Sequence, residues 1–109
     1  MIIGLDFYDT ITMEERRFKK LTDSLVTGGA EVYIISAIKQ ENLKRLQKDF
    51  RKSHNIGVLH PVFFENYGQV PKLKYQACKE LGVDFMIDDR IDVCQYIAAH
   101  GIPTLHFRA

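Results

Sequence analysis

The stretch that decides the fold runs from Met1 to Thr12 and reads MIIGLDFYDTIT. The mostly apolar residues up to Leu5 predict a buried strand, and Asp6 places one carboxylate where that strand ends. A turn-prone polar cluster over residues 8–10 follows at once. Because ligands of open parallel α/β sheets bind in the crevice beyond the carboxyl ends of the strands, we expect Asp6 in a ligand site rather than in the core.

The bulk composition indicates one domain spanning residues 1–109, because a chain of 109 residues with 46% hydrophobic content can bury one core but not two. The net charge of +1 alone indicates neither a nucleic-acid-binding protein nor a membrane-surface protein. No apolar run approaches the ~20 residues that a membrane span requires. Cys78 and Cys94 lack metal-ligand spacing, so we expect reduced thiols in a soluble, cytoplasmic protein.

Strand-like and helix-like segments alternate along the rest of the chain. Helices are expected over residues 14–27, 40–53, 71–81 and 92–99, and strands over residues 31–36, 56–64, 85–87 and 102–107. Thr12, with a glutamate three residues later, is expected to cap the first helix. Gly57 and Pro61 predict a strand that is short, bent or near a sheet edge. The alternation predicts a three-layer α/β/α sandwich with a five-stranded parallel, Rossmann-like sheet.

The helix expected over residues 40–53 carries a run of basic side chains on its polar faces. They are Lys44, Arg45, Lys48, Arg51 and Lys52. Acidic residues at positions 41 and 49 interrupt this run, which favours a solvated helix surface over a patch that binds a phosphate polymer.

Polar groups end three of the expected strands: Asp6 the first, Ser36 the second, and Asp88 with Asp89 the fourth. In a parallel sheet these ends meet at one edge, so the four side chains should converge in one crevice. Clustered carboxylates repel one another unless a cation lies among them, and oxygen ligands of this kind suit Mg²⁺.

Four motifs, in order along essentially the whole chain, resemble those of the haloacid dehalogenase-like (HAD) phosphohydrolase superfamily. They are the DFYDTIT segment from Asp6, the strand-ending Ser36, a lysine at a helix start (Lys72), and the pair Asp88-Asp89 after a strand. Lys74 is close enough in sequence to be the motif lysine instead of Lys72. A serine or an aspartate after a strand is also common as a helix N-cap, but four motifs in order on the right elements favour the resemblance.

The resemblance implies a role for each motif residue. Asp6 would be the nucleophile and would form an aspartyl-phosphate that water hydrolyses. Mg²⁺ would be held by Asp6, the backbone carbonyl of Tyr8 and Asp88, with Asp89 behind them or acting through water. The residues expected to bind or balance the phosphate are Thr10, Ser36 and Lys72.

The sequence departs from the superfamily pattern at Tyr8. Phosphatases of this superfamily usually place a second aspartate there, which protonates the leaving oxygen, whereas Asp9 lies one residue further on, where glycine is usual. A one-residue offset in this turn is expected to aim the Asp9 side chain elsewhere. Loss of a positioned general acid costs ~10²–10⁴-fold in rate, so substrates with poor leaving groups should turn over slowly.

No cap domain fits in the sequence, because only one helix separates Thr12 from the second strand, and only one helix and one strand separate Ser36 from Lys72. The site should therefore be open. An open site admits a large phosphorylated substrate, such as a macromolecule or a nucleic-acid end, or it is closed by a partner subunit.

Two functional hypotheses follow. The first is a Mg²⁺-dependent phosphohydrolase, a phosphatase with an altered acid–base step, and the intact Asp6, Ser36, motif lysine and acidic pair favour it. The second is a degenerate relative that keeps the fold as a metal- or phosphate-binding or regulatory module, and Tyr8 favours it. A phosphoacceptor receiver domain would carry its acidic pair after the first strand and its phosphoacceptor after the third, the reverse of the order found here.

Overall fold

Five parallel strands form one sheet in the order β3-β2-β1-β4-β5. The structure, a computed structural model, describes residues 1–109. The strands are β1 (Ile2–Leu5), β2 (Glu31–Ile38), β3 (Val58–Phe63), β4 (Phe85–Asp88) and β5 (Thr104–His106). In this register Leu5 lies between Ile34 of β2 and Ile87 of β4. The central strand β1 therefore delivers Asp6 to the middle of the carboxyl edge of the sheet.

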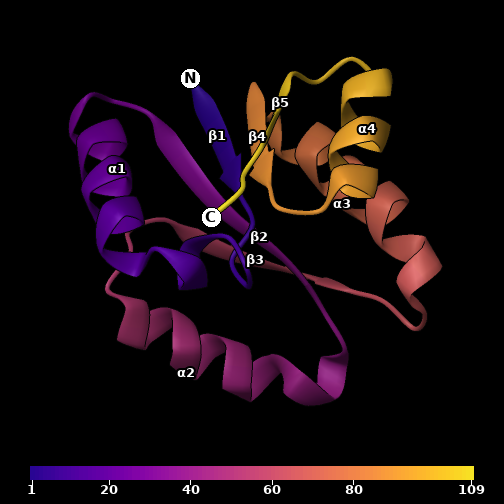
Figure 1. The fold of residues 1–109 in the computed structure, drawn as a ribbon, viewed down its shortest axis with the longest axis horizontal. Helices are drawn as coiled ribbons and strands as arrows, with labels where there is room; N and C mark the ends of the chain where they lie inside the picture. Colours follow the sequence, from indigo (N-terminus) through magenta and orange to yellow (C-terminus); the bar gives the residue numbers. More distant parts are fainter.

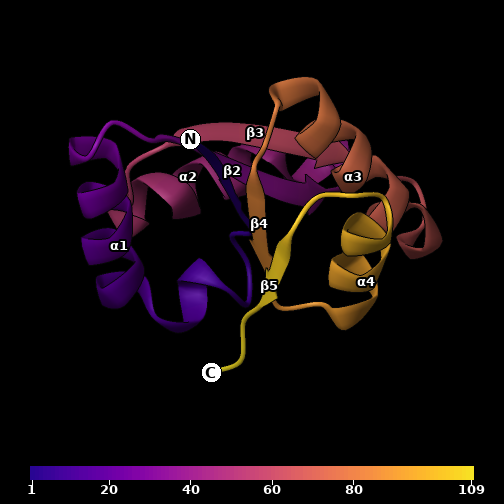
Figure 2. The same ribbon diagram turned by 90° about the horizontal axis from the view of Figure 1, so that it is seen from above.

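Four helices cover the two faces of this sheet. They are α1 (Glu15–Thr27), α2 (Leu43–Ser53), α3 (Val70–Leu81) and α4 (Ile91–Ala99). Figures 1 and 2 show α1 and α2 on one side of the sheet and α3 and α4 on the other. The molecule is thus the three-layer α/β/α sandwich with a five-stranded parallel, Rossmann-like sheet that the alternation of elements predicts.

Two apolar cores lie on the two faces of the sheet, because successive strand residues point to opposite sides. On β2, Ile34 packs with residues of α1 and α2, whereas Ile35 packs with residues of α3 and α4. Both side chains are fully buried. These two cores fix the positions of the strand ends, and with them the geometry of the carboxyl edge.

The observed elements differ from the expected ones in two places that affect the site. β2 continues to Ile38, so Ser36 lies inside the strand rather than at its end. Thr12 does not cap α1: its Oγ1 instead accepts a hydrogen bond from the backbone N–H of Asp9, 2.8 Å away, and the residues around it form a 3₁₀ turn, Ile11–Met13. The expectation that the strand containing Pro61 lies near a sheet edge is confirmed, since β3 is an edge strand.

The connections that flank β2 contain no inserted domain. Between β1 and β2 the chain forms a 3₁₀ turn and α1, and between β2 and β3 it forms a second 3₁₀ turn, Gln40–Asn42, and α2. Nothing in these connections covers the carboxyl edge as a lid would. None of the helices combines the length and the apolar character needed to cross a bilayer.

We predict that Leu46→Ala lowers the free energy of unfolding by about 2–5 kcal/mol, because this fully buried side chain anchors α2 to the sheet. Urea unfolding followed by circular dichroism measures the change. Lys48→Ala, on the exposed side of the same helix, is the matched control and should change stability by less than about 0.5 kcal/mol. Equal effects of the two substitutions would contradict this account of α2 packing.

Candidate functional site

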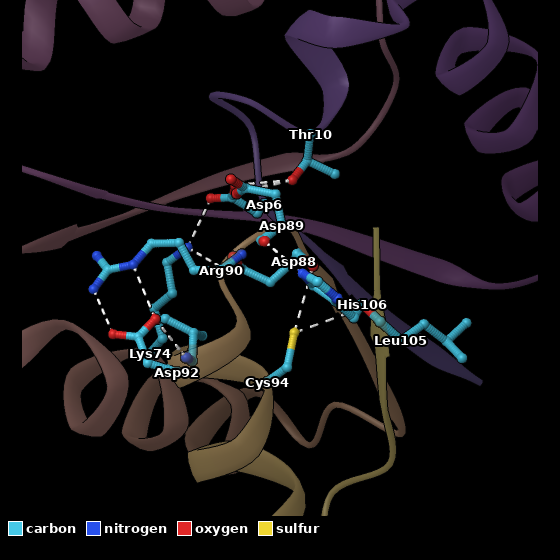
Figure 3. Close-up of polar contacts among 11 residues, drawn as sticks. Asp6, Thr10, Lys74, Asp88, Asp89, Arg90, Asp92, Cys94, Leu105 and His106 are labelled. Atoms are coloured by element: carbon cyan, nitrogen blue, oxygen red, sulfur yellow. Dashed lines mark hydrogen bonds and ion pairs between the residues drawn. The ribbon is translucent and has the colours of Figure 1, made fainter. Parts of the chain in front are cut away.

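An acidic cluster lies at the carboxyl edge of the sheet. Asp6 follows β1, Asp88 ends β4, and Asp89 follows it, so two neighbouring strands bring the three side chains together (Figure 3). One carboxylate oxygen from each residue lies within 4.8 Å of the others, a spacing at which they could hold a metal ion. Asp6 and Asp88 are buried and Asp89 is half-buried. The predicted convergence of these carboxylates is confirmed.

Lys74 bridges the two buried carboxylates. Its Nζ lies 2.7 Å from Oδ1 of Asp6 and 2.6 Å from Oδ2 of Asp88, and its side chain is only 3% exposed. Figure 3 shows this side chain reaching from α3 to the ends of β1 and β4. A single ammonium group thus ties three distant segments of the chain together.

The prediction that Lys72 is the lysine of the site is wrong. Lys72 is exposed on α3, whereas Lys74 lies on the buried stripe of that helix with Val70 and Ala77. Each helical residue turns by about 100°, so Lys72 lies well off this stripe. The signal was present in the sequence, since Lys74 is three residues before Ala77 and four before Cys78, both of which the periodicity assigns to the core.

Burial changes the acidity of both partners in this bridge. Burial raises the pKa of Asp6 to about 7, and the Lys74 ammonium only partly opposes this shift. Burial also acts to lower the pKa of Lys74, but the carboxylates of Asp6 and Asp88 more than offset it and raise that pKa. The lysine therefore stays charged, while Asp6 needs a further cation nearby to be fully ionised at neutral pH.

Further hydrogen bonds orient the two buried carboxylates. The hydroxyl of Thr10 donates to Oδ2 of Asp6 at 3.0 Å and lies 3.4 Å from Oδ1 of Asp89. The backbone N–H of Arg90 donates to Oδ1 of Asp88 at 3.0 Å. Thr10 was expected to bind phosphate, but it is fully buried and directs its one proton to carboxylates rather than to the cleft. In this structure Thr10 lies outside the cleft lining, and its hydroxyl orients the carboxylate of Asp6.

Ser36 presents an unpartnered hydroxyl beside the acidic cluster. The residue is 1% exposed, yet its Oγ has no hydrogen-bond partner. A buried polar atom without a partner costs about 1–3 kcal/mol, so such a group calls for a physical reason. Ser36 lines the same cleft as Asp6 and Lys74, and a ligand oxygen bound there would satisfy it.

An open cleft of about 540 Å³ leads from the acidic cluster to solvent. Asp6, Ser36 and Lys74 form its inner end together with Asp89. The outer walls come from the segments after β1, β2, β3 and β4, and their larger side chains are Tyr8, Lys39, Arg45, Phe64, Tyr67 and Arg90. The volume exceeds what one phosphate group fills, so the cleft has room for part of a larger molecule.

Tyr8 is held on the wall of this cleft by a contact with α2. Its phenol donates a 2.7 Å hydrogen bond to Oδ2 of Asp49, and the guanidinium of Arg45 lies 5.7 Å from the ring centre. Burial and the neighbouring Asp49 raise the pKa of Tyr8 to about 12. A phenol that is this weakly acidic, with its proton directed to Asp49, is a poor proton donor to a leaving group.

Asp9 has a left-handed backbone, with φ of 62°, a conformation that favours glycine. The residue is exposed and borders the cleft. The turn after β1 therefore keeps the tight geometry for which the sequence pattern usually provides glycine. No hydrogen bond ties the Asp9 carboxylate to the acidic cluster.

Four residues that the sequence analysis did not assign to the site shape the outer cleft or fix Tyr8. Asp49 holds the phenol of Tyr8, and Arg45, Tyr67 and Arg90 line the walls. Tyr8 and Asp49 are 41 positions apart, so no local pattern pairs them. The side chain of Arg90 forms an ion pair at 2.7 Å with Asp92, which lies in the first turn of α4.

Comparison with known proteins defines the fold of this chain and nothing finer. No protein-family model and no curated protein matches it. Among solved structures, a chain of the Pnkp1/Rnl/Hen1 RNA repair complex matches over 97% of this chain, with a TM-score of 0.71 and 14% identity. This chain spans only 42% of that relative's length. A universal stress protein from Archaeoglobus fulgidus matches with a TM-score of 0.65 and 14% identity, over 99% of this chain and 98% of its own.

The donor set fits a divalent cation. Three carboxylates opposed by one ammonium leave two negative charges at the inner end of the cleft. Each oxygen of Asp6 and Asp88 accepts one hydrogen bond, and a carboxylate offers about four lone-pair sites, so both groups keep free lone pairs. Hard oxygen ligands of this kind suit Mg²⁺ and Ca²⁺.

We predict that Lys74→Met destabilises the metal-free protein by about 3–5 kcal/mol at pH 8, because it leaves two buried carboxylates without their cation. The loss should be smaller at pH 5, below the raised pKa of Asp6, where this carboxyl is mostly protonated and needs no partner. Thermal and urea unfolding at the two pH values measure both effects.

Lys72→Met on the same helix is the matched control and should leave stability nearly unchanged at both pH values. An equal loss in the two variants, or a larger loss for Lys74→Met at pH 5 than at pH 8, would contradict the bridge.

Proposed function

We propose that the protein is a Mg²⁺-dependent phosphohydrolase of the HAD-like type, with Asp6 as its nucleophile. The observation that carries this proposal is the inner end of the cleft, where Asp6, the bridging Lys74 and the unpartnered hydroxyl of Ser36 face one space. A nucleophile, a positive charge and a free donor are the groups that phosphoryl transfer requires.

Each residue of the inner cleft has one role in this proposal. Ser36 donates its hydroxyl to an oxygen of the transferring phosphoryl group, which satisfies the buried Oγ. Lys74 holds Asp6 in place and offsets charge on the phosphoryl oxygens. Thr10 orients the second oxygen of Asp6. Asp6, Asp88, Asp89 and the backbone carbonyl of Tyr8 are the proposed ligands of Mg²⁺, which when bound supplies positive charge to the phosphoryl group and keeps Asp6 ionised.

The proposed reaction has two steps. An oxygen of the Asp6 carboxylate attacks phosphorus, an aspartyl-phosphate forms, and the bond from phosphorus to the leaving group breaks with its electron pair going to the leaving oxygen. Water then attacks phosphorus of the aspartyl-phosphate, which releases inorganic phosphate and restores the Asp6 carboxylate. The water proton passes to solvent in the open cleft.

The proposed substrates have leaving groups that depart without a proton from the enzyme. Tyr8, which occupies the position of the usual acid, directs its proton to Asp49 and has a pKa of about 12. Acyl phosphates and aryl phosphates meet this requirement, because their leaving oxygens are stable as anions. The open cleft also favours a phosphate on a large molecule. A cytoplasmic location, consistent with two free buried cysteines, belongs to the same proposal.

The alternative is a binding or regulatory module that holds a metal or phosphate without turnover. The specific observation in its favour is the same hydrogen bond from Tyr8 to Asp49, because it leaves the site without a positioned acid. The two functions differ in one measurable property, the release of phosphate.

We predict Mg²⁺-dependent release of phosphate from p-nitrophenyl phosphate and acetyl phosphate, abolished by EDTA and by Asp6→Asn. Asp23→Asn, which changes a carboxylate on α1 away from the cleft, is the matched control and should retain the wild-type rate. Calorimetric titration with Mg²⁺ accompanies the assay. Mg²⁺ binding without any release of phosphate would reject the phosphatase in favour of the binding module.

We predict that Tyr8→Asp increases turnover of alkyl phosphates, whose leaving groups need a proton, by ~10²-fold, the lower end of the range for general acid catalysis. Turnover of acetyl phosphate should change little. Tyr8→Phe, which removes the hydroxyl but keeps the ring, should give no gain with either substrate. An equal gain from both variants would show that release of Asp49, rather than the new carboxylate, is responsible.

A further inference from the structure

The basic side chains of the chain are concentrated on α2 and just before it, in a segment that begins at the cleft. Six of its fifteen Lys and Arg residues lie between positions 39 and 52, although the net charge of the whole chain is only +1. They are Lys39, Lys44, Arg45, Lys48, Arg51 and Lys52, and all six are exposed. Five of them belong to α2, whose one acidic residue is Asp49.

Asp49 offsets only one of the five cations of α2. It accepts the phenol hydrogen bond of Tyr8 at 2.7 Å and lies 3.7 Å from the Nε of Arg45. The remaining cations of α2, Lys44, Lys48, Arg51 and Lys52, form no ion pair. The exposed side of α2 is therefore a strip of positive charge about 16 Å long, the length of 11 helical residues.

This strip leads into the proposed phosphate site. Arg45 and the residues just before α2, Glu41 and Asn42, line the cleft that ends at Asp6 and Ser36. Figure 1 shows α2 beginning next to the carboxyl end of β2, the strand that carries Ser36. A polyanion lying along α2 would therefore bring its terminal group to the inner end of the cleft. Glu41 is the one acidic residue of this segment without a counter-charge, and it lies at the rim.

An exposed aromatic ring faces the same cleft. Tyr67 is 68% exposed, and its ring rests on buried Phe64 with a 5.0 Å separation of ring centres. The loop that presents Tyr67 is fixed, because Gln69 accepts hydrogen bonds from the backbone N–H groups of Glu65 and Asn66. An aromatic side chain held this way in solvent offers one free face on which a planar group can stack.

We propose that α2, Arg45 and Tyr67 form a docking surface for single-stranded nucleic acid, whose terminal phosphate enters the cleft. Positive charge along a groove and an aromatic platform are the two features by which proteins bind single strands without reading their sequence. A phosphopeptide would use the charge but not the stacking platform. The proposal goes beyond the phosphohydrolase proposed above, because it concerns docking, which is independent of turnover. A terminal nucleotide phosphate has an alkyl leaving oxygen, so a site without a positioned acid would release it slowly.

The test is fluorescence anisotropy with a labelled, 5′-phosphorylated oligothymidylate of about ten nucleotides, within the site sizes of single-strand binders. Mg²⁺ is present to balance the carboxylates of the inner cleft, and every protein in this test carries Asp6→Asn so that no hydrolysis occurs. Lys48→Ala/Arg51→Ala should weaken binding and reduce the slope of log affinity against log salt by about 1.4, because each lost phosphate contact removes ~0.7 from the slope. Lys20→Ala/Lys79→Ala, which removes the same charge from exposed positions of α1 and α3, should leave affinity and slope unchanged.

Tyr67→Ala should weaken binding by ~10-fold, as expected for the loss of one stacked base, and Tyr67→Phe should retain the affinity. Equal losses from the two charge variants, or no loss from Tyr67→Ala, would overturn the proposal. So would a phosphoserine peptide of equal charge that competes as well as the oligonucleotide.

Hydrolysis of p-nitrophenyl phosphate separates this proposal from the proposed function. Metal-dependent hydrolysis without oligonucleotide binding would overturn the docking surface alone. Oligonucleotide binding with the predicted effects of the variants, but without hydrolysis of any phosphate, would support the docking surface and reject the phosphatase.

Discussion

The bridge from Lys74 to Asp6 and Asp88 is the interaction on which the rest of the site depends. Burying three ionised groups costs several kcal/mol each unless they neutralise one another in good geometry, and here the contacts are 2.6 and 2.7 Å long. An apolar side chain at position 74 would extend the buried stripe of α3 without this cost. Lys74 thus places a buried charge at a position where an apolar residue would pack. Departures of this kind from the usual burial pattern are concentrated at functional sites. When all three carboxylates are ionised, the bridge leaves the cluster with two uncompensated negative charges, and a divalent cation would balance them.

The cleft has two ends with different physical characters. Its inner end is rigid, because Asp6, Ser36 and Asp89 sit on or directly after strands that two apolar cores hold in place. Its outer end is formed by side chains on α2 and on the segments after β3 and β4, and the hydrogen bond from Tyr8 to Asp49 links α2 to the turn that follows Asp6. The same contact therefore removes a proton donor from the inner end and positions Arg45 at the outer end. In this account the restriction to good leaving groups follows from the contact between Tyr8 and Asp49, whereas the openness of the site follows from the short connections after β1 and β2, which hold no inserted domain.

The sequence predicts the layers of the fold because they depend on local periodicity: apolar runs and amphipathic stripes alternate along the whole chain. It also predicts that Asp6, Ser36, Asp88 and Asp89 converge, because parallel strands end at one edge. Choosing between Lys72 and Lys74 requires the phase of α3, which the apolar stripe of that helix encodes but the motif spacing does not. The contact from Tyr8 to Asp49 lies beyond any local pattern, since it depends on how α2 packs against a residue 41 positions earlier in the chain. The basic run on α2 has the same limit. The sequence shows its charge, but only the structure shows that the helix begins beside the cleft.

The most direct test of the central claim is to trap the phosphorylated enzyme. The protein is mixed with acetyl phosphate and Mg²⁺, quenched in acid, and analysed by intact mass spectrometry, with borohydride reduction to mark the acyl phosphate before peptide mapping. The account predicts a mass gain of one phosphoryl group, located on Asp6 and absent from Asp6→Asn. A phosphoryl group on another residue, or none in a protein that hydrolyses acetyl phosphate, would contradict the assignment of Asp6 as the nucleophile.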